Sequence, residues 1–284
     1  MPTDSLTSTG YGRKVSTPLW SLRMAWELER AAFRGQLEYR LNFVIMAFLG
    51  IAYQGSGFAF IWVVLSRFHT LDGWTFHDLA FLYALRLLSH ATWVVPFNLL
   101  SEIDMVLREG RFDQFLVRPL NPLLQVITHR FRMNVIGDVI TAFALFVLAA
   151  NLANVSFTPI HVIYLVLAVV GGALAEGAII LACASLSFRL LETWALRFLI
   201  DNVYLMFGSY PLRIFGAGIS WSFTWLVPIA FVAYIPSSVL LKHAEGLHVA
   251  PVIAWGAPAV GFIWFIAAYQ FWRWQLKSYQ SSGH

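Results

Sequence analysis

The sequence predicts an all-α membrane protein that crosses the bilayer six times, and three observations indicate this fold class. Hydrophobic residues make up 59% of the 284 residues and charged residues only 12%, whereas soluble domains contain about 25% charged residues. Six apolar segments are long enough to cross a bilayer as helices, which takes about 20 residues each. The charged residues gather between these segments. A soluble globule is excluded, because it would expose far too much apolar surface.

The chain begins with two segments that are not expected to cross the membrane. Residues 1–18 are polar and predict a disordered tail. Residues 20–40 predict a helix lying in the membrane interface, because Trp20, Met24 and Leu28 recur at helical spacing while basic and acidic residues occupy the other faces. The alternative is a polar tail whose periodicity arises by chance.

The six predicted spans cover residues 41–65, 78–100, 133–154, 160–188, 194–215 and 250–272. The fourth carries a face of small residues that permits close helix packing, formed by Gly171, Gly172, Ala175 and Gly177. The segment 216–241 is apolar but interrupted by Gly and Pro. It predicts either a seventh span or a re-entrant pair of short helices.

The distribution of basic residues favours six spans and a re-entrant segment. With both termini in the cytoplasm, fifteen of the 19 Lys and Arg residues lie on the cytoplasmic side, as cytoplasmic loops require. We therefore expect a multi-pass protein of the plasma membrane, in a bacterium the inner membrane. The basic excess is explained by this asymmetry, and no nucleic-acid partner is expected.

Five ionisable residues fall inside the predicted spans: Arg86, His90, Asp138, Glu176 and Asp201. Charges at membrane depth are costly, so they usually face partners or a water-filled path. Arg86 and His90 are four residues apart and share a helix face. The group predicts either the polar lining of a substrate path or interhelical pairs, for instance Arg86 with Glu176 or Asp201. Asp138 and Asp201 lie near span ends, where an interfacial position is the simpler interpretation.

No motif in the sequence predicts catalysis. It contains no G-x-x-x-x-G-K-[ST] phosphate loop, no H-E-x-x-H, no Cys/His cluster and no G-x-S-x-G serine. We therefore expect no catalytic, cofactor-binding or metal-binding residues in this chain.

Residues 101–122, the coupling segment, begin the longest polar interval between spans. Leu99, Ile103, Val106 and Leu107 form an apolar stripe at helical spacing. Gly110 interrupts the helix, and the prolines that follow stop it. A charged helix and a sharp turn predict a docking surface for another protein, with a solvated connector as the alternative.

Within this segment the sequence resembles a known family. Residues 110–119, Gly-Arg-Phe-Asp-Gln-Phe-Leu-Val-Arg-Pro, resemble the G-x-x-D-x-x-L-(L/V)-x-P signature of ABC-2-type transporter permeases with six spans per subunit. A second block fits the same branch: Ser209-Tyr210-Pro211, then 228–231 and 234–237. A weaker echo runs over 274–281.

This resemblance implies a membrane subunit without catalytic residues of its own. Such permeases pair as homodimers or heterodimers, and two cytosolic ATPase subunits bind ATP and Mg²⁺ and drive export. By the resemblance, the positions expected to contact or position the ATPase are Glu102, Arg108, Gly110, Arg111, Phe112, Asp113, Arg118 and Pro119. The re-entrant segment would be marked by Tyr210, Pro211, Pro228 and Pro236.

The function expected on these grounds is ATP-driven export, and two alternatives stay open. The aromatic residues of 41–65 favour an amphipathic or lipid-like cargo, although such residues also suit ordinary packing or lipid contact. One alternative is an autonomous secondary transporter in which Glu176, Asp138 and His90 relay protons. The other is a membrane-embedded enzyme, which would need a clustered polar site near one interface.

Overall fold

The computed structural model describes residues 40–67, 70–128, 134–190, 192–243, 247 and 249–279. Within these ranges helices are the only regular elements apart from one isolated bridge between Leu71 and Trp74, which confirms the predicted all-α class. The predicted tail over 1–18 and nearly all of the predicted interfacial helix over 20–40 lie outside the described residues.

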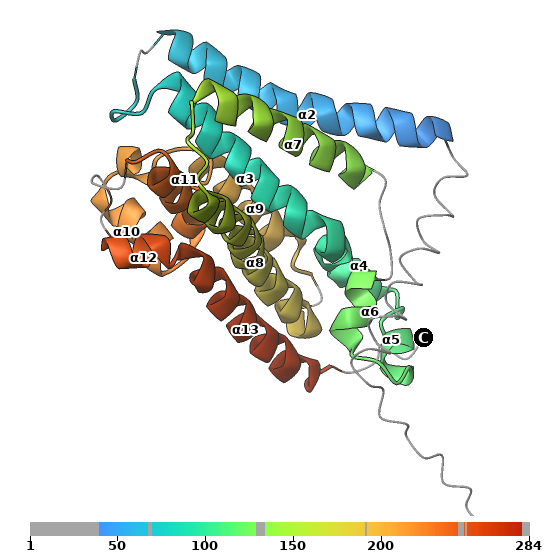
Figure 1. The fold of residues 1–284 in the computed structure, drawn as a ribbon. Helices are drawn as coiled ribbons and strands as arrows, with labels where there is room; N and C mark the ends of the chain where they lie inside the picture. Colours follow the sequence, from blue (N-terminus) through green and yellow to red (C-terminus); the bar gives the residue numbers. More distant parts are fainter. Residues whose placement is uncertain are drawn as a thin grey trace, which may run out of the picture.

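The longer helices run roughly along one another, and the short helices gather at their two ends (Figure 1). The longer helices are α2 (Arg40–Arg67), α3 (Phe76–Phe97), α7 (Asn134–Leu152), α8 (Pro159–Leu190), α9 (Trp194–Phe207) and α13 (Ala257–Leu276). At one end lie α10 (Ala217–Trp225), α11 (Tyr234–Leu240) and α12 (Pro251–Trp255). At the other lie α4 (Ile103–Arg108), α5 (Asp113–Val117) and α6 (Pro122–Thr128).

Fewer helices meet the requirement for crossing a membrane than the six expected. By length and composition three stretches of the described chain qualify: Phe76–Arg108, Val135–Leu152 and Pro159–Leu190. A fourth is reached if the bent pair Ala217–Trp225 and Pro228–Leu240 counts as one span. The predicted span over 194–215 holds only the 14-residue helix α9 and the 3-10 turn η2 (Leu212–Phe215). Pro211 between them lacks the amide proton that a continuing helix needs.

The bent pair lies in the segment predicted to be re-entrant. Its two arms meet at 71° near Pro228, and the short 3-10 turn η3 (Ile229–Phe231) follows the bend. At the start of α10, Gly216 has a φ of +86°, a conformation that favours glycine. This geometry fits either a broken span or a re-entrant loop.

Helices α8 and α13 pack at backbone distance, and glycine makes this possible. A Cβ at Gly171 would lie 2.5 Å from the carbonyl oxygen of Pro258, and a Cβ at Gly261 would collide with the backbone of Gly171. On α8, Gly172 and Gly177 face the side chains of Ser89 and Trp93 of α3, where a Cβ would lie 2.8 and 3.3 Å from the nearest atom of each. The predicted small-residue face therefore brings both α3 and α13 close to α8.

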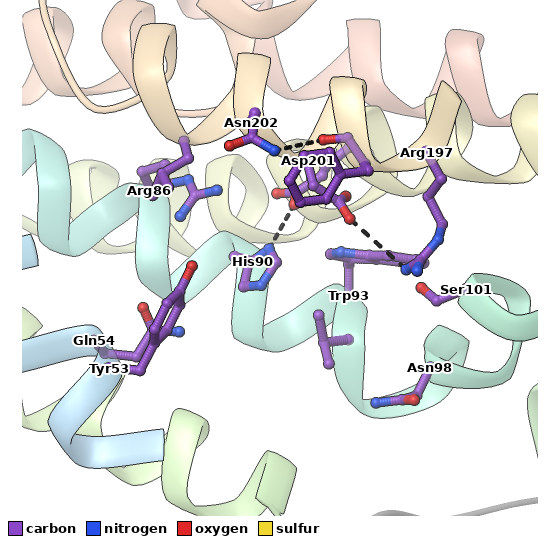
Figure 2. Close-up of a pocket in the computed structure, with 14 residues that line it drawn as sticks. Tyr53, Gln54, Arg86, His90, Trp93, Asn98, Ser101, Arg197, Asp201 and Asn202 are labelled. Carbon is purple, nitrogen blue, oxygen red and sulfur yellow. Dashed lines mark hydrogen bonds and ion pairs between the residues drawn. The ribbon is translucent and has the colours of Figure 1, made fainter. Parts of the chain in front are cut away.

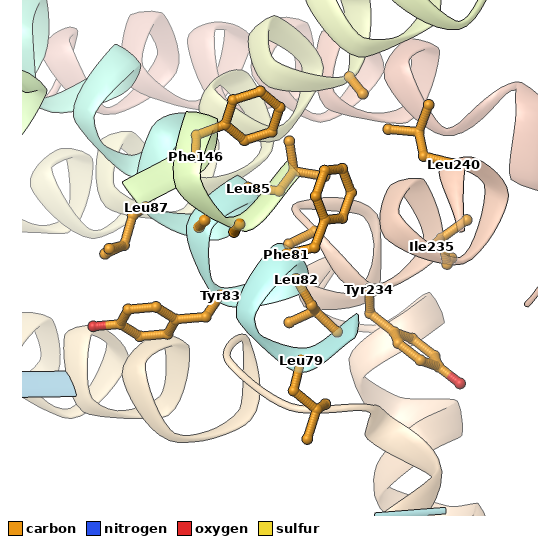
Figure 3. Packing of buried hydrophobic residues seen from close by; sticks show 14 of the residues in the cluster. Leu79, Phe81, Leu82, Tyr83, Leu85, Leu87, Phe146, Tyr234, Ile235 and Leu240 are labelled. Carbon is orange, nitrogen blue, oxygen red and sulfur yellow. The ribbon is translucent and has the colours of Figure 1, made fainter. Parts of the chain in front are cut away.

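Helix α3 occupies the centre of the apolar core. A capping box opens it: the Thr75 hydroxyl accepts a bond from the backbone of Asp78, whose carboxylate binds the Thr75 backbone in return. The first turns of α3 are buried against α7 and α11, where Phe81 meets Phe146 and Leu79 and Leu82 lie near Tyr234 (Figure 3). This core holds α3 rigidly upstream of its charged residues.

Candidate functional site

Four of the five ionisable residues predicted inside the spans line a single cavity of about 390 Å³. Arg86 and His90 reach it from α3, Glu176 from α8 and Asp201 from α9 (Figure 2). The fifth, Asp138 on α7, does not line the cavity.

The closest contact in the cavity joins His90 to Glu176. His90 Nδ1 lies 2.5 Å from Glu176 Oε1, and Glu176 is 3% exposed. The indole N–H of Trp93 faces the same carboxylate without reaching hydrogen-bond geometry. Of the interhelical pairs named as one possibility from the sequence, Arg86 with Glu176 does not form, and His90 pairs with Glu176 instead. The two side chains share a face of α3, and only the packing of α3 on α8 decides which one reaches Glu176.

A second ion pair lines the cavity on α9, where Arg197 lies 3.7 Å from Asp201. From the sequence Arg197 looks like a charge beside the membrane, so its place in the cavity was missed. The signal was present, because Arg197 and Asp201 are four residues apart and such pairs face each other on a helix.

Arg86 differs from the other charged lining residues. It is 4% exposed, it forms no ion pair with any residue that the structure describes, and its Nε has no hydrogen-bond partner there. Glu176 and Asp201 act on it only at longer range. A buried arginine without a close counterion is costly, which singles out this position.

Uncharged polar groups complete the lining. They are Tyr53, Gln54, Asn98, Ser101 and Asn202. Sequence reasoning missed them because isolated amides and hydroxyls in apolar segments carry no distinct pattern. Their hydrogen-bonding capacity makes the cavity suitable for a polar or charged group.

The coupling segment forms a compact knot at one end of the molecule. After η1 (Asn98–Glu102), helix α4 ends at Arg108, and Gly110, with a φ of +67°, reverses the chain two residues later. The predicted apolar stripe of Leu99, Ile103, Val106 and Leu107 is buried. It packs with Phe188 of α8 and Trp272 of α13 in one cluster.

Phe112 and Asp113 are held inside this knot. Phe112 is fully buried and its ring contacts Phe115, Phe188, Trp272 and Tyr279. It therefore cannot touch a partner at its present position, and its role is packing. Asp113 accepts a hydrogen bond of 2.9 Å from the Tyr279 hydroxyl, which joins the knot to the segment after α13. Burial and this bond raise the pKa of Tyr279 to about 12.

Residues 116–119 protrude from the knot and are called the exposed tip. Leu116 is 44% and Val117 83% exposed, and Arg118 and Pro119 are exposed as well. Arg118 is extended, as a residue before proline prefers.

The other predicted coupling residues precede the tip in the chain. Arg108 forms long ion pairs of 3.9 and 3.8 Å with Asp104 and Glu192. Arg111 pairs with Glu109, and Glu102 is half-buried in η1.

The residues predicted to mark the re-entrant segment lie at the opposite end of the bundle. Tyr210 lines a second, mostly apolar cavity of about 620 Å³. Pro211 precedes η2, Pro228 lies at the 71° bend and Pro236 is buried inside α11. Among the described residues no group of three or more His, Cys, Asp or Glu side chains is placed to hold a metal ion.

Several apolar helices of membrane-spanning length and a charged cavity between them define a helical membrane protein. The profile of the ABC-2 family transporter proteins matches residues 51–283, and the chain therefore belongs to this family. The family expected from residues 110–119 is thus confirmed, and its members are typically non-catalytic membrane subunits of transporters. Comparisons with curated proteins and with solved structures give no match.

Proposed function

We propose that this chain is the membrane subunit of an ATP-driven exporter, which two copies of it or a related chain form with two cytosolic ATPase subunits. It moves an amphipathic or lipid-like cargo out of the cytoplasm across the plasma membrane, the inner membrane in a bacterium. The ATPase subunits bind ATP and Mg²⁺ and dock on the exposed tip. In this arrangement each subunit crosses the membrane six times, with both termini in the cytoplasm and 216–241 re-entrant.

The observation that carries the proposal is that residues 116–119, the exposed tip, present apolar side chains to solvent in a chain of the ABC-2 family. Val117 is 83% exposed, and its chain neighbours Leu116 and Arg118 are exposed as well. Exposed apolar side chains rimmed by polar ones are typical of protein interaction sites.

The packing of the knot supports a mechanical link from the tip to the cavity. Phe112 and Phe115 pack on Phe188 of α8 and Trp272 of α13. The same helix α8 carries Glu176, and α3 carries His90 just before η1. Densely packed cores transmit displacement instead of absorbing it. Closure of an ATPase dimer on the tip would therefore shift α3 and α8 relative to each other and rearrange the cavity.

The test is purification of the tagged full-length chain from its own membranes in mild detergent. We expect an ATP-binding cassette ATPase in equal amount with the chain, and ATP-dependent cargo movement after reconstitution. A chain that purifies without any ATPase, from membranes that contain one, would refute the proposal.

The His90–Glu176 pair favours one alternative function, that of a proton-coupled secondary transporter. A histidine bonded to a buried carboxylate is suited to proton relay. Flux through the reconstituted chain alone, driven by a pH gradient and unchanged by ATP, would favour that alternative. Flux that requires both the ATPase and ATP would exclude it.

A further inference from the structure

We propose that the cargo is an anionic amphiphile, whose phosphate or carboxylate group binds Arg86 and whose apolar part occupies the adjoining cavity. This inference rests on the proposed function, because it treats the polar cavity as the place where cargo binds. It is carried by the ion pairing in the cavity and by the position of a second cavity beside it.

Of the charged residues that line the cavity, Arg86 is the one without a close partner among the described residues. Glu176 is bonded to His90 at 2.5 Å, and Asp201 is paired with Arg197 at 3.7 Å. Both carboxylates of the lining are thus paired with residues other than Arg86. The side chain of Arg86 is only 4% exposed. An anionic group in the cavity would supply the counterion that Arg86 lacks among the described residues.

The chemistry of Arg86 favours an oxyanion with two available oxygens. Its planar guanidinium matches phosphate and carboxylate in a bidentate manner. Arg197 lies on the other side of His90 (Figure 2), and its Nε is also buried without a hydrogen-bond partner. Because Arg197 is paired with Asp201, the preference for an anion rests on Arg86.

The second cavity provides room for an apolar chain. It measures about 620 Å³ and is lined by Phe60, Ile61, Met206 and other residues of α2, α3 and α9. The same three helices line the polar cavity, and Asn202 and Leu205 line both. A ligand whose charged group lies beside Arg86 therefore has an apolar cavity next to that group. A ligand that fills both cavities would need a charged group and an apolar chain.

The direct test measures binding of tritiated dodecyl phosphate to the full-length chain in phosphatidylcholine nanodiscs. We expect it to bind about tenfold or more tightly than dodecyltrimethylammonium and than inorganic phosphate. Equal affinity for the cationic amphiphile would overturn the proposal. Equal affinity for inorganic phosphate would do so as well, since the apolar part would then contribute nothing.

Substitutions assign the two parts of the ligand. Arg86→Gln should weaken binding of dodecyl phosphate about tenfold or more, and Arg86→Lys should weaken it less because the charge is kept. Arg189→Gln is the matched control, since Arg189 stacks on Trp274 and does not line the cavity. Met206→Trp should weaken dodecyl phosphate and leave hexyl phosphate unchanged, because Met206 lines the second cavity and not the polar one. Wild-type affinity in folded Arg86→Gln would contradict the proposal; if that variant does not fold, wild-type affinity for dodecyl phosphate in Met206→Trp would.

The binding test does not involve the ATPase, so the two proposals can fail separately. A chain that binds dodecyl phosphate through Arg86 and recruits no ATPase would refute the exporter and leave the ligand class intact. A chain that recruits the ATPase and ignores anionic amphiphiles would do the reverse.

Discussion

Glu176 and His90 face each other across α3 and α8, and the Glu176 carboxylate is buried, where an unpaired charge is costly. Among the residues that the structure describes, this is the one ion pair that joins these two helices. A change in the spacing of α3 and α8 would therefore lengthen this contact or reorient it.

Replacing Glu176 with Gln should lower the transport rate without lowering expression. The amide has the shape of the carboxylate but removes the negative charge that His90 contacts. We expect transport to fall about tenfold, which corresponds to about 1.4 kcal/mol, measured as cargo flux in vesicles that contain equal amounts of protein.

The matched control is Asp72→Asn. Asp72 pairs with Arg213 at 3.5 Å away from the polar cavity, and its φ of +51° is one that Asn tolerates. Its transport should equal that of the wild type. Unchanged flux in Glu176→Gln would mean that the cavity does not conduct cargo.

At the scale of elements, α8 and α13 make the closest glycine contact among the described residues. Gly261→Ala should destabilise the protein by about 1–3 kcal/mol, as overpacking of a filled interface does, because the added methyl group collides with the backbone of Gly171. The measurement is the unfolding temperature in detergent.

Gly55→Ala on α2 provides the control, because a Cβ at Gly55 meets nothing within 4 Å. Alanine is a better helix former than glycine by about 0.5–1 kcal/mol, so this variant should be neutral or slightly more stable. If Gly261→Ala were as stable as Gly55→Ala, the backbone contact between α8 and α13 would not exist.

The bond from Tyr279 to Asp113 ties the end of α13 to the coupling segment, and it predicts a specific dependence on pH. The folded state holds the Tyr279 proton to about pH 12, whereas the ordinary pKa is 10.0. Because the pKa is raised on folding, the stabilisation is complete below pH 10 and is lost as pH rises toward 12.

Tyr279→Phe should therefore unfold at a lower temperature than the wild type by a constant margin below pH 10. This margin should shrink between pH 10 and pH 12. Comparison of the two proteins removes the contribution of the other tyrosines. A margin that is absent, or that grows with pH, would contradict the bond.

At the scale of the whole molecule, composition and hydropathy were enough to predict a helical membrane protein. They could not predict where every helix ends. A span was predicted over 194–215 because most of these residues are apolar, and the helix-breaking tendency of Gly208 and Pro211 received too little weight. The helix ends at Phe207. Long apolar segments indicate membrane depth, whereas helix ends depend on single residues.

The site was predictable as a set of residues but not as an arrangement. The energetic cost of placing a charge inside a membrane was enough to select four residues that line one cavity: Arg86, His90, Glu176 and Asp201. Which of them pair depends on the rotation of α3 against α8, and this is decided by tertiary packing. The motif of 110–119 likewise marked the coupling segment without separating buried Phe112 from exposed Val117.

The central claim is that an ATPase grips the exposed tip, at the opposite end of the molecule from α10, α11 and α12 (Figure 1). A photoreactive amino acid placed at Val117 tests it in cells. The matched control is Val252 on α12, which is 82% exposed against 83% for Val117. The account predicts a crosslink to an ABC ATPase from position 117 and none from position 252. A crosslink from position 252 alone, or from neither position while the complex remains intact, would contradict it.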